Sequence, residues 1–201
     1  MSPITHLLAS WAVAEGCTSN KRERLWICLA GVAPDVDGLG IAVDLTNEML
    51  GRAPTQFYPH YHHFLFHGIF GALVTVAIAR AAGVRRLWAL VLVFLSFHLH
   101  LLCDFVGARG PDWYDYWVIH YLGPFTYAGT FWWSHQWPLN GWQNFLITIA
   151  LVAWTFARTI RNGASPMSLV SQKWDSTLVC TLRQWRLQIQ AARKRNIGPA
   201  T

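Results

Sequence analysis

Residues 86–106, RLWALVLVFLSFHLHLLCDFV, form an apolar run that is interrupted by few polar side chains. A helix that spans the hydrocarbon core of a bilayer needs about 20 predominantly apolar residues. The rest of the 201-residue chain is similar in character, with 53% hydrophobic and only 13% charged residues. Soluble domains carry about 25% charged residues. We therefore expect an integral membrane protein.

Four further apolar stretches are each too long for a typical strand, so the sequence predicts an all-α fold, a membrane bundle of about five helices. The expected helices cover residues 3–15, 24–34, 63–82, 86–106 and 141–158. The last three are long enough to span a bilayer, whereas the first two either dip into it or pack against the others. Residues 38–60 and 107–140 are expected to be connecting loops.

The C-terminal part is expected to differ from a membrane-embedded domain over residues 1–162. Within residues 163–201, apolar side chains recur at spacings of three and four among basic ones, which predicts a basic amphipathic helix over about 166–195. Such a helix lies on a membrane surface. A helix that binds a partner protein is the alternative.

Basic turns and His/Asp clusters alternate at the successive ends of the expected helices. Basic turns follow the first, third and fifth helices, and His/Asp clusters lie at the opposite helix ends. The histidines and aspartates therefore gather at one end of the bundle, which predicts a shared site there. By the positive-inside rule the basic end faces the cytoplasm.

Helical spacing selects residues within these clusters. Residues four apart lie on one face of a helix, as His100 and Asp104 do, and as His63 and His67 do. His62 is five positions before His67 and joins the same site only if it precedes the first helical turn. The choice between His62 and His63 stays open.

Carboxylates at the ends of apolar segments need compensation. A carboxylate at the centre of a membrane helix costs roughly 2.5–3.5 kcal/mol, so Asp35, Asp37 and Asp104 favour a bound cation. Mixed His and Asp ligands without cysteine suit zinc, with manganese or iron also possible. More than four ligands predict two or more ions, which would activate water and clamp the oxygens of a phosphoester. Asp35 or Asp37 is also a candidate general base.

The loop over residues 107–140 is rich in tryptophan, which is typical of the aromatic belt at a membrane–water interface. His120 and His135 lie in this loop, near the predicted site. Either residue is a candidate to complete the metal shell or to bind substrate.

Four motifs in order, THLLASW, APDVDGLG, YHHFLFHG and FHLHLLCDFVG, resemble those of the YdjM-like membrane-bound metal-dependent hydrolases. The H-x3-D element is also similar to that of zinc-dependent phospholipase C, which implies a zinc phosphodiesterase site. The family usually has HRG-x-TH at this place. Here His63 and Phe64 replace the Arg-Gly pair and Phe66 replaces the threonine, so a substrate contact made by that arginine is missing. The resemblance implies a location in the bacterial inner membrane and metal ligands at His6, Asp35, Asp37, His62, His67, His100 and Asp104.

The sequence thus predicts a membrane metal-dependent hydrolase that acts on ester or phosphoester bonds of a lipid or another membrane-surface substrate. Asp35, Asp37 and Asp104 are the candidate catalytic residues. The alternative is a transporter or a non-catalytic metal-binding protein, but FGALVTVAIA and LITIALVAW carry only threonines as polar residues, which speaks against transport. The net charge of +6 resides in short turns and a tail, so no nucleic-acid partner is expected.

Overall fold

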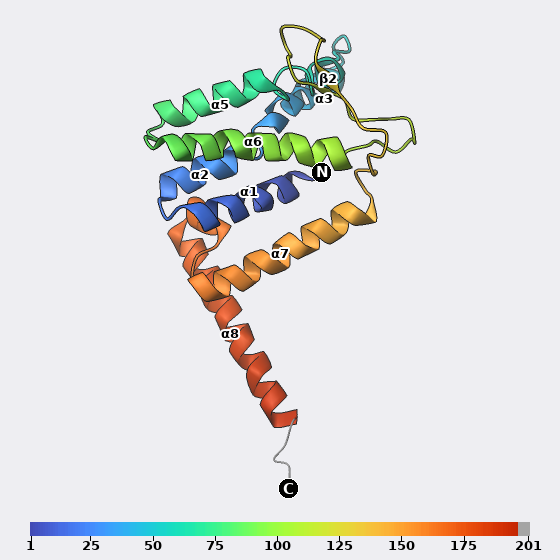
Figure 1. Ribbon diagram of the computed structural model, residues 1–201. Helices are drawn as coiled ribbons and strands as arrows, with labels where there is room; N and C mark the ends of the chain where they lie inside the picture. Colours follow the sequence, from blue (N-terminus) through green and yellow to red (C-terminus); the bar gives the residue numbers. More distant parts are fainter. Residues whose placement is uncertain (197–201) are drawn as a thin grey trace. The chain divides into compact units, whose positions relative to one another are not determined.

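The computed structural model describes residues 1–196 and is dominated by helices, which confirms the all-α prediction (Figure 1). Its elements are α1 (Pro3–Cys17), α2 (Lys21–Ala30), the 3-10 helix η1 (Pro34–Leu39), α3 (Gly40–Met49), α4 (Phe57–Tyr61), α5 (Ile69–Ala81), α6 (Leu87–Gly107), β1 (Ile119–His120), β2 (Thr130–Phe131), α7 (Trp142–Asn162), the 3-10 helix η2 (Pro166–Leu169) and α8 (Gln172–Asn196). β1 and β2 pair antiparallel.

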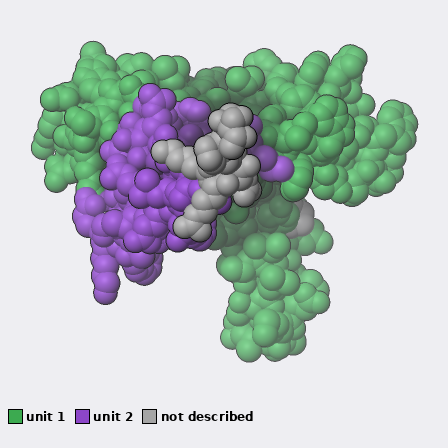
Figure 2. Space-filling view, turned by 90° about the horizontal axis from the view of Figure 1, so that it is seen from below, with its two compact units in different colours: residues 1–148 green, residues 149–201 purple. Residues whose placement is uncertain are grey.

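The chain divides into two compact units, residues 1–148 and residues 149–201 (Figure 2). The boundary falls within α7, whereas the sequence suggested a division after residue 162. In the second unit, α8 provides the predicted C-terminal helix, preceded by η2. Residues 197–201 of the predicted tail lie outside the described residues. The membrane-surface role of α8 stays a prediction.

Local capping sets the starts of the first two helices. Ser2 caps α1 by accepting a hydrogen bond from the backbone N–H of Thr5, and a proline occupies the first turn. Asn20 caps α2 by accepting from the N–H groups of Arg22 and Glu23. These side-chain oxygens satisfy N–H groups that a helix leaves unpaired at its first turn.

In the first unit, α1, α2, α5 and α6 lie side by side (Figure 1). Their shared core contains Trp11, Ile27, Val93 and Phe97, whose side chains are fully buried. The hydroxyl of Ser96 on α6 donates a 2.8 Å hydrogen bond to the Ile27 carbonyl on α2, so a buried polar contact also joins these helices.

Two sequence expectations need correction. Residues 38–60 were expected to be a loop, but they contain α3 and α4. The helix expected over 63–82 begins only at Ile69. In the turn before it, the backbone N–H groups of His63 and Phe66 donate to the Asp37 carboxylate and not to helical carbonyls. The resulting α5 has 13 residues and is too short for the predicted span.

Within the described residues, α6 and α7 are long and apolar enough to cross a bilayer. The segments Lys21–Ala30 and Pro34–Met49 provide a third span if this pair, bent by 60°, is counted as one. The chain is therefore associated with a membrane.

The close approach of α1 and α2 at Gly31 generates a prediction. A Cβ on Gly31 would lie 1.7 Å from Ser10 Oγ and 3.2 Å from the His6 carbonyl oxygen. We expect Gly31→Ala to destabilise the protein by about 1–3 kcal/mol, the usual cost of overpacking. Thermal unfolding in detergent measures this.

Gly16→Ala is the matched control for this substitution. Gly16 lies within α1, and an added Cβ there would have no atom outside its own helix within 4 Å. Its replacement should leave the melting temperature unchanged or raise it, since alanine favours a helix. Equal melting temperatures for the two variants would contradict the proposed close packing.

Candidate metal centre

The structure brings the predicted His/Asp clusters together from four parts of the chain. α1 carries the first histidine, η1 carries two aspartates, the turn between α4 and α5 carries three histidines, and the C-terminal half of α6 carries a histidine and an aspartate. In the same order, these residues are His6, Asp35, Asp37, His62, His63, His67, His100 and Asp104.

Four residues form the inner cluster, Asp35, His67, His100 and Asp104. Each offers one nitrogen or oxygen atom, and these atoms all lie within 4.8 Å of one another. His100 Nε2 is 2.9 Å from Asp104 Oδ2 and 3.6 Å from Asp35 Oδ1. His67 Nε2 is 3.9 Å from the same Asp35 oxygen. His67, His100 and Asp104 are buried, and Asp35 is half-buried.

Hydrogen bonds at the opposite ring nitrogens assign the tautomers of both histidines. His100 Nδ1 lies 2.9 Å from the Gly31 carbonyl oxygen, which only accepts, so Nδ1 carries the proton. His67 Nδ1 lies 3.0 Å from Asp37 Oδ2 and donates in the same way. A neutral imidazole then has its lone pair on Nε2. Both Nε2 lone pairs therefore point into the inner cluster.

These lone pairs lack donors within the described part of the chain. Neither His67 Nε2 nor His100 Nε2 has a hydrogen-bond partner, and the buried Asp35 Oδ2 has none either. The contact between His100 and Asp104 is short but lacks hydrogen-bond geometry. Two nitrogen lone pairs and two carboxylates facing one another repel unless a cation lies between them, and the Met1 ammonium offsets this repulsion at Asp104 only.

The spacing of the inner cluster suits a small metal ion. Zinc binds His nitrogen and carboxylate oxygen at about 2.0–2.2 Å, so its tetrahedral ligands lie about 3.3–3.6 Å apart. The observed separations of 2.9, 3.6 and 3.9 Å cover this range. The inner cluster can therefore hold a metal ion.

Asp37 lies outside the inner cluster and has a different set of contacts. Its two oxygens accept from His62 Nδ1 at 2.8 Å, His67 Nδ1 at 3.0 Å, and the backbone N–H groups of Phe66 at 3.0 Å and His63 at 3.2 Å. Three of these donors share Oδ2 and one uses Oδ1, so Oδ1 keeps a lone pair that none of them uses. Asp37 thus orients His62 and His67, and its role as a metal ligand or general base stays a prediction.

His6 lies at the edge of the inner cluster. Its ring stacks on the His100 ring with a centroid distance of 3.8 Å, and its Nε2 is 3.2 Å from Asp104 Oδ1. The Met1 amino group also contacts this oxygen. Burial lowers the pKa of His6 despite the opposing effect of Asp104. The neutral ring therefore adds a second imidazole beside the Asp104 carboxylate.

His62 and His63 lie side by side at the other edge of the inner cluster. His62, Asp37 and His67 form a second group whose ligand atoms lie within 4.8 Å, but Asp37 already holds both rings through Nδ1. His63 has a φ of 74°, a left-handed conformation that is uncommon for a residue with a Cβ. Burial, with repulsion from the neighbouring imidazoles, lowers the pKa of His63 to about 2. Its buried Nε2 has no hydrogen-bond partner among the described residues.

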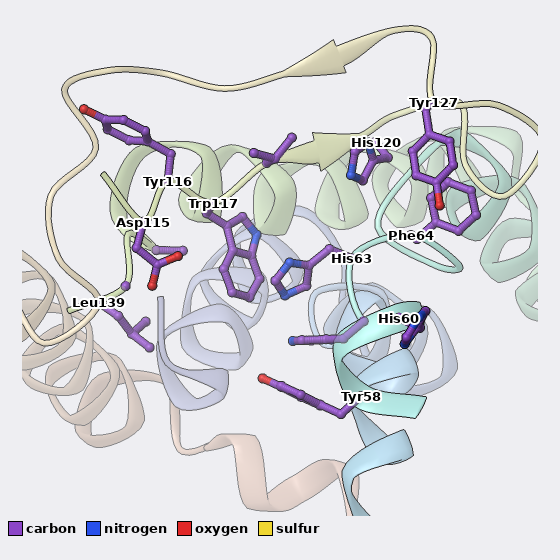
Figure 3. A pocket seen from close by; sticks show the side chains of 14 residues that line it. Tyr58, His60, His63, Phe64, Asp115, Tyr116, Trp117, His120, Tyr127 and Leu139 are labelled. Carbon is purple, nitrogen blue, oxygen red and sulfur yellow. The ribbon is translucent and has the colours of Figure 1, made fainter. Parts of the chain in front are cut away.

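A pocket of about 510 Å³ adjoins the cluster, and His62 and His63 belong to its lining. Figure 3 shows His63 beside Trp117, with Tyr58 and His120 also along the pocket. Burial lowers the pKa of His120, which keeps its ring neutral. The pocket thus adjoins the inner cluster through His62 and His63 and is lined largely by imidazole and aromatic rings.

The two loop histidines of the sequence analysis thus have different surroundings. His120 lines the pocket and shares a 3.2 Å hydrogen bond with the Thr130 hydroxyl. His135 is exposed and is hydrogen-bonded to Ser134. Among the described residues, neither belongs to a group that could hold a metal ion.

Sequence reasoning missed two components of this region. The Gly31 carbonyl orients His100, but a backbone acceptor leaves no mark in a pattern of side chains. Trp117 was assigned to the aromatic belt, yet its ring lies against His63 with a centroid distance of 3.2 Å. A tryptophan in a Trp-rich loop carries no signal that separates the two roles.

A scan of protein-family models and searches of curated proteins and solved structures find no match to this chain. The resemblance to a hydrolase family therefore rests on the four motifs alone.

We expect His100→Ala to abolish stoichiometric metal binding, because it removes the nitrogen that lies nearest to both carboxylates of the inner cluster. Elemental analysis of protein purified in detergent measures this. His135→Ala is the control, since it removes an exposed imidazole outside the cluster. Equal metal content in the two variants would rule out the proposed ligand set.

Asp37→Asn tests the positioning role separately. The amide accepts at one of its two polar atoms only, so the hydrogen bonds from His62 to Oδ1 and from His67 to Oδ2 cannot both persist, and one of these histidines loses its fixed orientation. Removing such an orienting partner typically weakens metal affinity by about 10–100-fold. Competition with a metal-binding dye should show weakened binding that is not abolished. Complete loss of the metal from a folded Asp37→Asn protein would instead make Asp37 a ligand.

Proposed function

We propose that this protein is an integral membrane metal-dependent hydrolase, of the kind that its motifs resemble. The observation that carries the proposal is the convergence of two Nε2 lone pairs and two carboxylates in one buried cluster. If His100 were protonated at both nitrogens, its Nε2–H would donate to Asp104 and to no other member of the inner cluster. It would leave His67 Nε2 and Asp35 without a partner, so a metal ion accounts for more of the site.

Zinc is the proposed metal, because the ligands combine imidazole and carboxylate and include no cysteine. His67, His100 and Asp104 would hold it, together with Asp35. When bound, such an ion lowers the pKa of a coordinated water toward neutrality. A second ion, as expected of a phosphoester hydrolase, would bind at the second group, which is formed by Asp37, His62 and His67.

Asp35 is the proposed general base. It is the most exposed member of the inner cluster, and its Oδ2 makes no hydrogen bond among the described residues. One oxygen can therefore contact the metal while the other accepts a proton from the attacking water. Asp37 is less suited to this role because its oxygens already accept four hydrogen bonds.

The proposed substrate is an ester or phosphoester of a membrane lipid. The inner cluster includes the C-terminal half of α6, a helix with the length and composition of a membrane span, and the adjoining pocket is lined by aromatic rings. Such a site receives substrates at the surface of a leaflet. In the proposed orientation the basic turns face the cytoplasm of a bacterial inner membrane, and the site faces the other side.

Transport is less well supported than hydrolysis. In the part of α6 that leads away from the site, His98 is hydrogen-bonded to the Phe94 carbonyl and the Tyr121 hydroxyl. There and in α5, Ser96 and Thr75 both donate to backbone carbonyls. Their hydroxyl hydrogens are thus used within the bundle, and these two helices offer no continuous polar path. A metal-binding protein without catalytic activity remains the alternative outcome of the experiment below.

The test is hydrolysis of a phospholipid panel by metal-loaded protein in mixed micelles. We expect turnover that a chelator removes and zinc restores. Asp35→Asn should lower kcat by about 10²–10⁴-fold, the usual contribution of a general base, while most of the metal remains bound. Asp112→Asn makes the same change of charge at an exposed loop position and should leave kcat unchanged.

Two results would count against the proposal. Metal-loaded wild-type protein that hydrolyses no member of the panel would indicate a non-catalytic metal-binding protein. Full activity of metal-loaded Asp35→Asn would remove Asp35 as the base and leave only its role as a ligand.

A further inference from the structure

A second polar pocket lies between the basic turns of the first unit. The α1–α2 turn and the α5–α6 turn lie at the same end of these helices (Figure 1). Together they surround a pocket of about 430 Å³. Its lining residues are Asn20, Lys21, Arg22, Glu23, Gly83, Arg85 and Arg86.

The charge of this pocket is strongly positive. Four of its lining residues are basic, and all four are exposed. The single carboxylate, Glu23, is buried and already accepts a 2.6 Å hydrogen bond from Thr18, while Arg86 lies 3.8 Å away. Glu23 therefore neutralises little of the positive charge that faces solvent.

Packing across the two turns brings the basic groups together. A Cβ on Gly83 would lie 2.6 Å from Arg22 Nη1, so the Arg22 guanidinium packs directly over this glycine. Gly83 has a φ of 95°, which also disfavours any larger residue. The absence of a side chain at residue 83 lets the Arg22 side chain reach the turn that carries Arg85.

An apolar groove adjoins the basic pocket, because Arg86 lines both. This groove has a volume of about 960 Å³ and is lined by Cys17, Arg86, Leu87, Trp88, Val91 and Leu92. Apart from Cys17, these residues belong to the start of α6 or immediately precede it. Leu87 and Val91 are exposed to 77% and 47%, so apolar surface extends from the basic pocket along a candidate membrane span.

We propose that these two features form a binding site for one anionic phospholipid. The headgroup phosphate would lie among Arg22, Arg85 and Arg86, and an acyl chain would follow the groove along α6. Charge complementarity selects an anionic lipid, because basic residues near a membrane attract such headgroups. The continuous groove selects a lipid over a soluble phosphate, which has no apolar part to bury there.

This site is separate from the metal centre. Arg86 precedes α6, and Asp104 lies near the end of the same helix, roughly 27 Å away at 1.5 Å per residue. That separation is close to the thickness of a bilayer core, about 30 Å. The lipid would therefore bind in the leaflet opposite the metal centre, and the inference does not rest on the proposed hydrolase activity.

Native mass spectrometry of the full chain in detergent tests the proposal. The probes are phosphatidylglycerol, phosphatidylcholine with the same acyl chains, and glycerol phosphate. We expect one tightly retained phosphatidylglycerol, and binding of phosphatidylcholine that is about tenfold weaker. Arg22→Gln/Arg85→Gln should weaken phosphatidylglycerol binding by about tenfold or more, since each basic group contributes to the attraction.

Arg52→Gln/Arg80→Gln is the matched control, because it removes the same charge from two exposed arginines outside the pocket. It should leave the preference for phosphatidylglycerol intact. Equal loss in both double variants would show diffuse surface attraction and overturn the proposal. Displacement of the lipid by an equal concentration of glycerol phosphate would overturn it too, because the site would then be one for a soluble phosphate.

Alkylation of Cys17 provides an independent measurement in wild-type protein. Cys17 lines the groove, whereas the exposed Cys180 lies in the second unit and serves as an internal reference. Phosphatidylglycerol should slow the reaction of a maleimide with Cys17 relative to Cys180. An unchanged ratio of the two rates at saturating lipid would place the acyl chain elsewhere and contradict the proposed groove.

Discussion

Two hydrogen bonds at Nδ1, one in His100 and one in His67, determine the chemistry of the site. The Gly31 carbonyl and the Asp37 carboxylate accept these protons and thereby leave both Nε2 lone pairs pointing toward the inner cluster. In the other tautomer of either histidine, Nε2 would carry the proton and could not bind a metal ion. Because each hydrogen bond joins segments far apart in the chain, correct packing of the helices and formation of the site are the same event.

Asp35 and Asp37 show that two neighbouring carboxylates take different roles when their surroundings differ. Asp35 and Asp37 are two positions apart in one 3-10 helix, yet one faces the inner cluster with an unpaired oxygen and the other holds a turn together. Because of that turn, α5 begins only at Ile69, and His67 lies within the inner cluster. The shortening of the expected membrane helix is thus the structural consequence of building the site.

Much of this arrangement follows from sequence patterns. The alternation of basic turns and His/Asp clusters predicts that helix ends converge, and the i,i+4 spacing predicts that His100 and Asp104 share a face, as they do. The extra helices α3 and α4 escaped notice because they are short, with 10 and 5 residues, and lie in a segment without a long apolar run. The orientation of each imidazole escaped as well, since hydrogen-bond partners such as the Gly31 carbonyl come from the backbone.

The sequence by itself determined two properties of this protein. Its helices are apolar enough for a bilayer, and its imidazoles and carboxylates are grouped at the helix ends. These properties depend on composition and on the helical repeat, which are local. Only the tertiary structure decided which of those groups form the inner cluster and which position them, and that Arg22 meets the α5–α6 turn over Gly83. Such choices depend on directions and distances between helices, which no local pattern encodes.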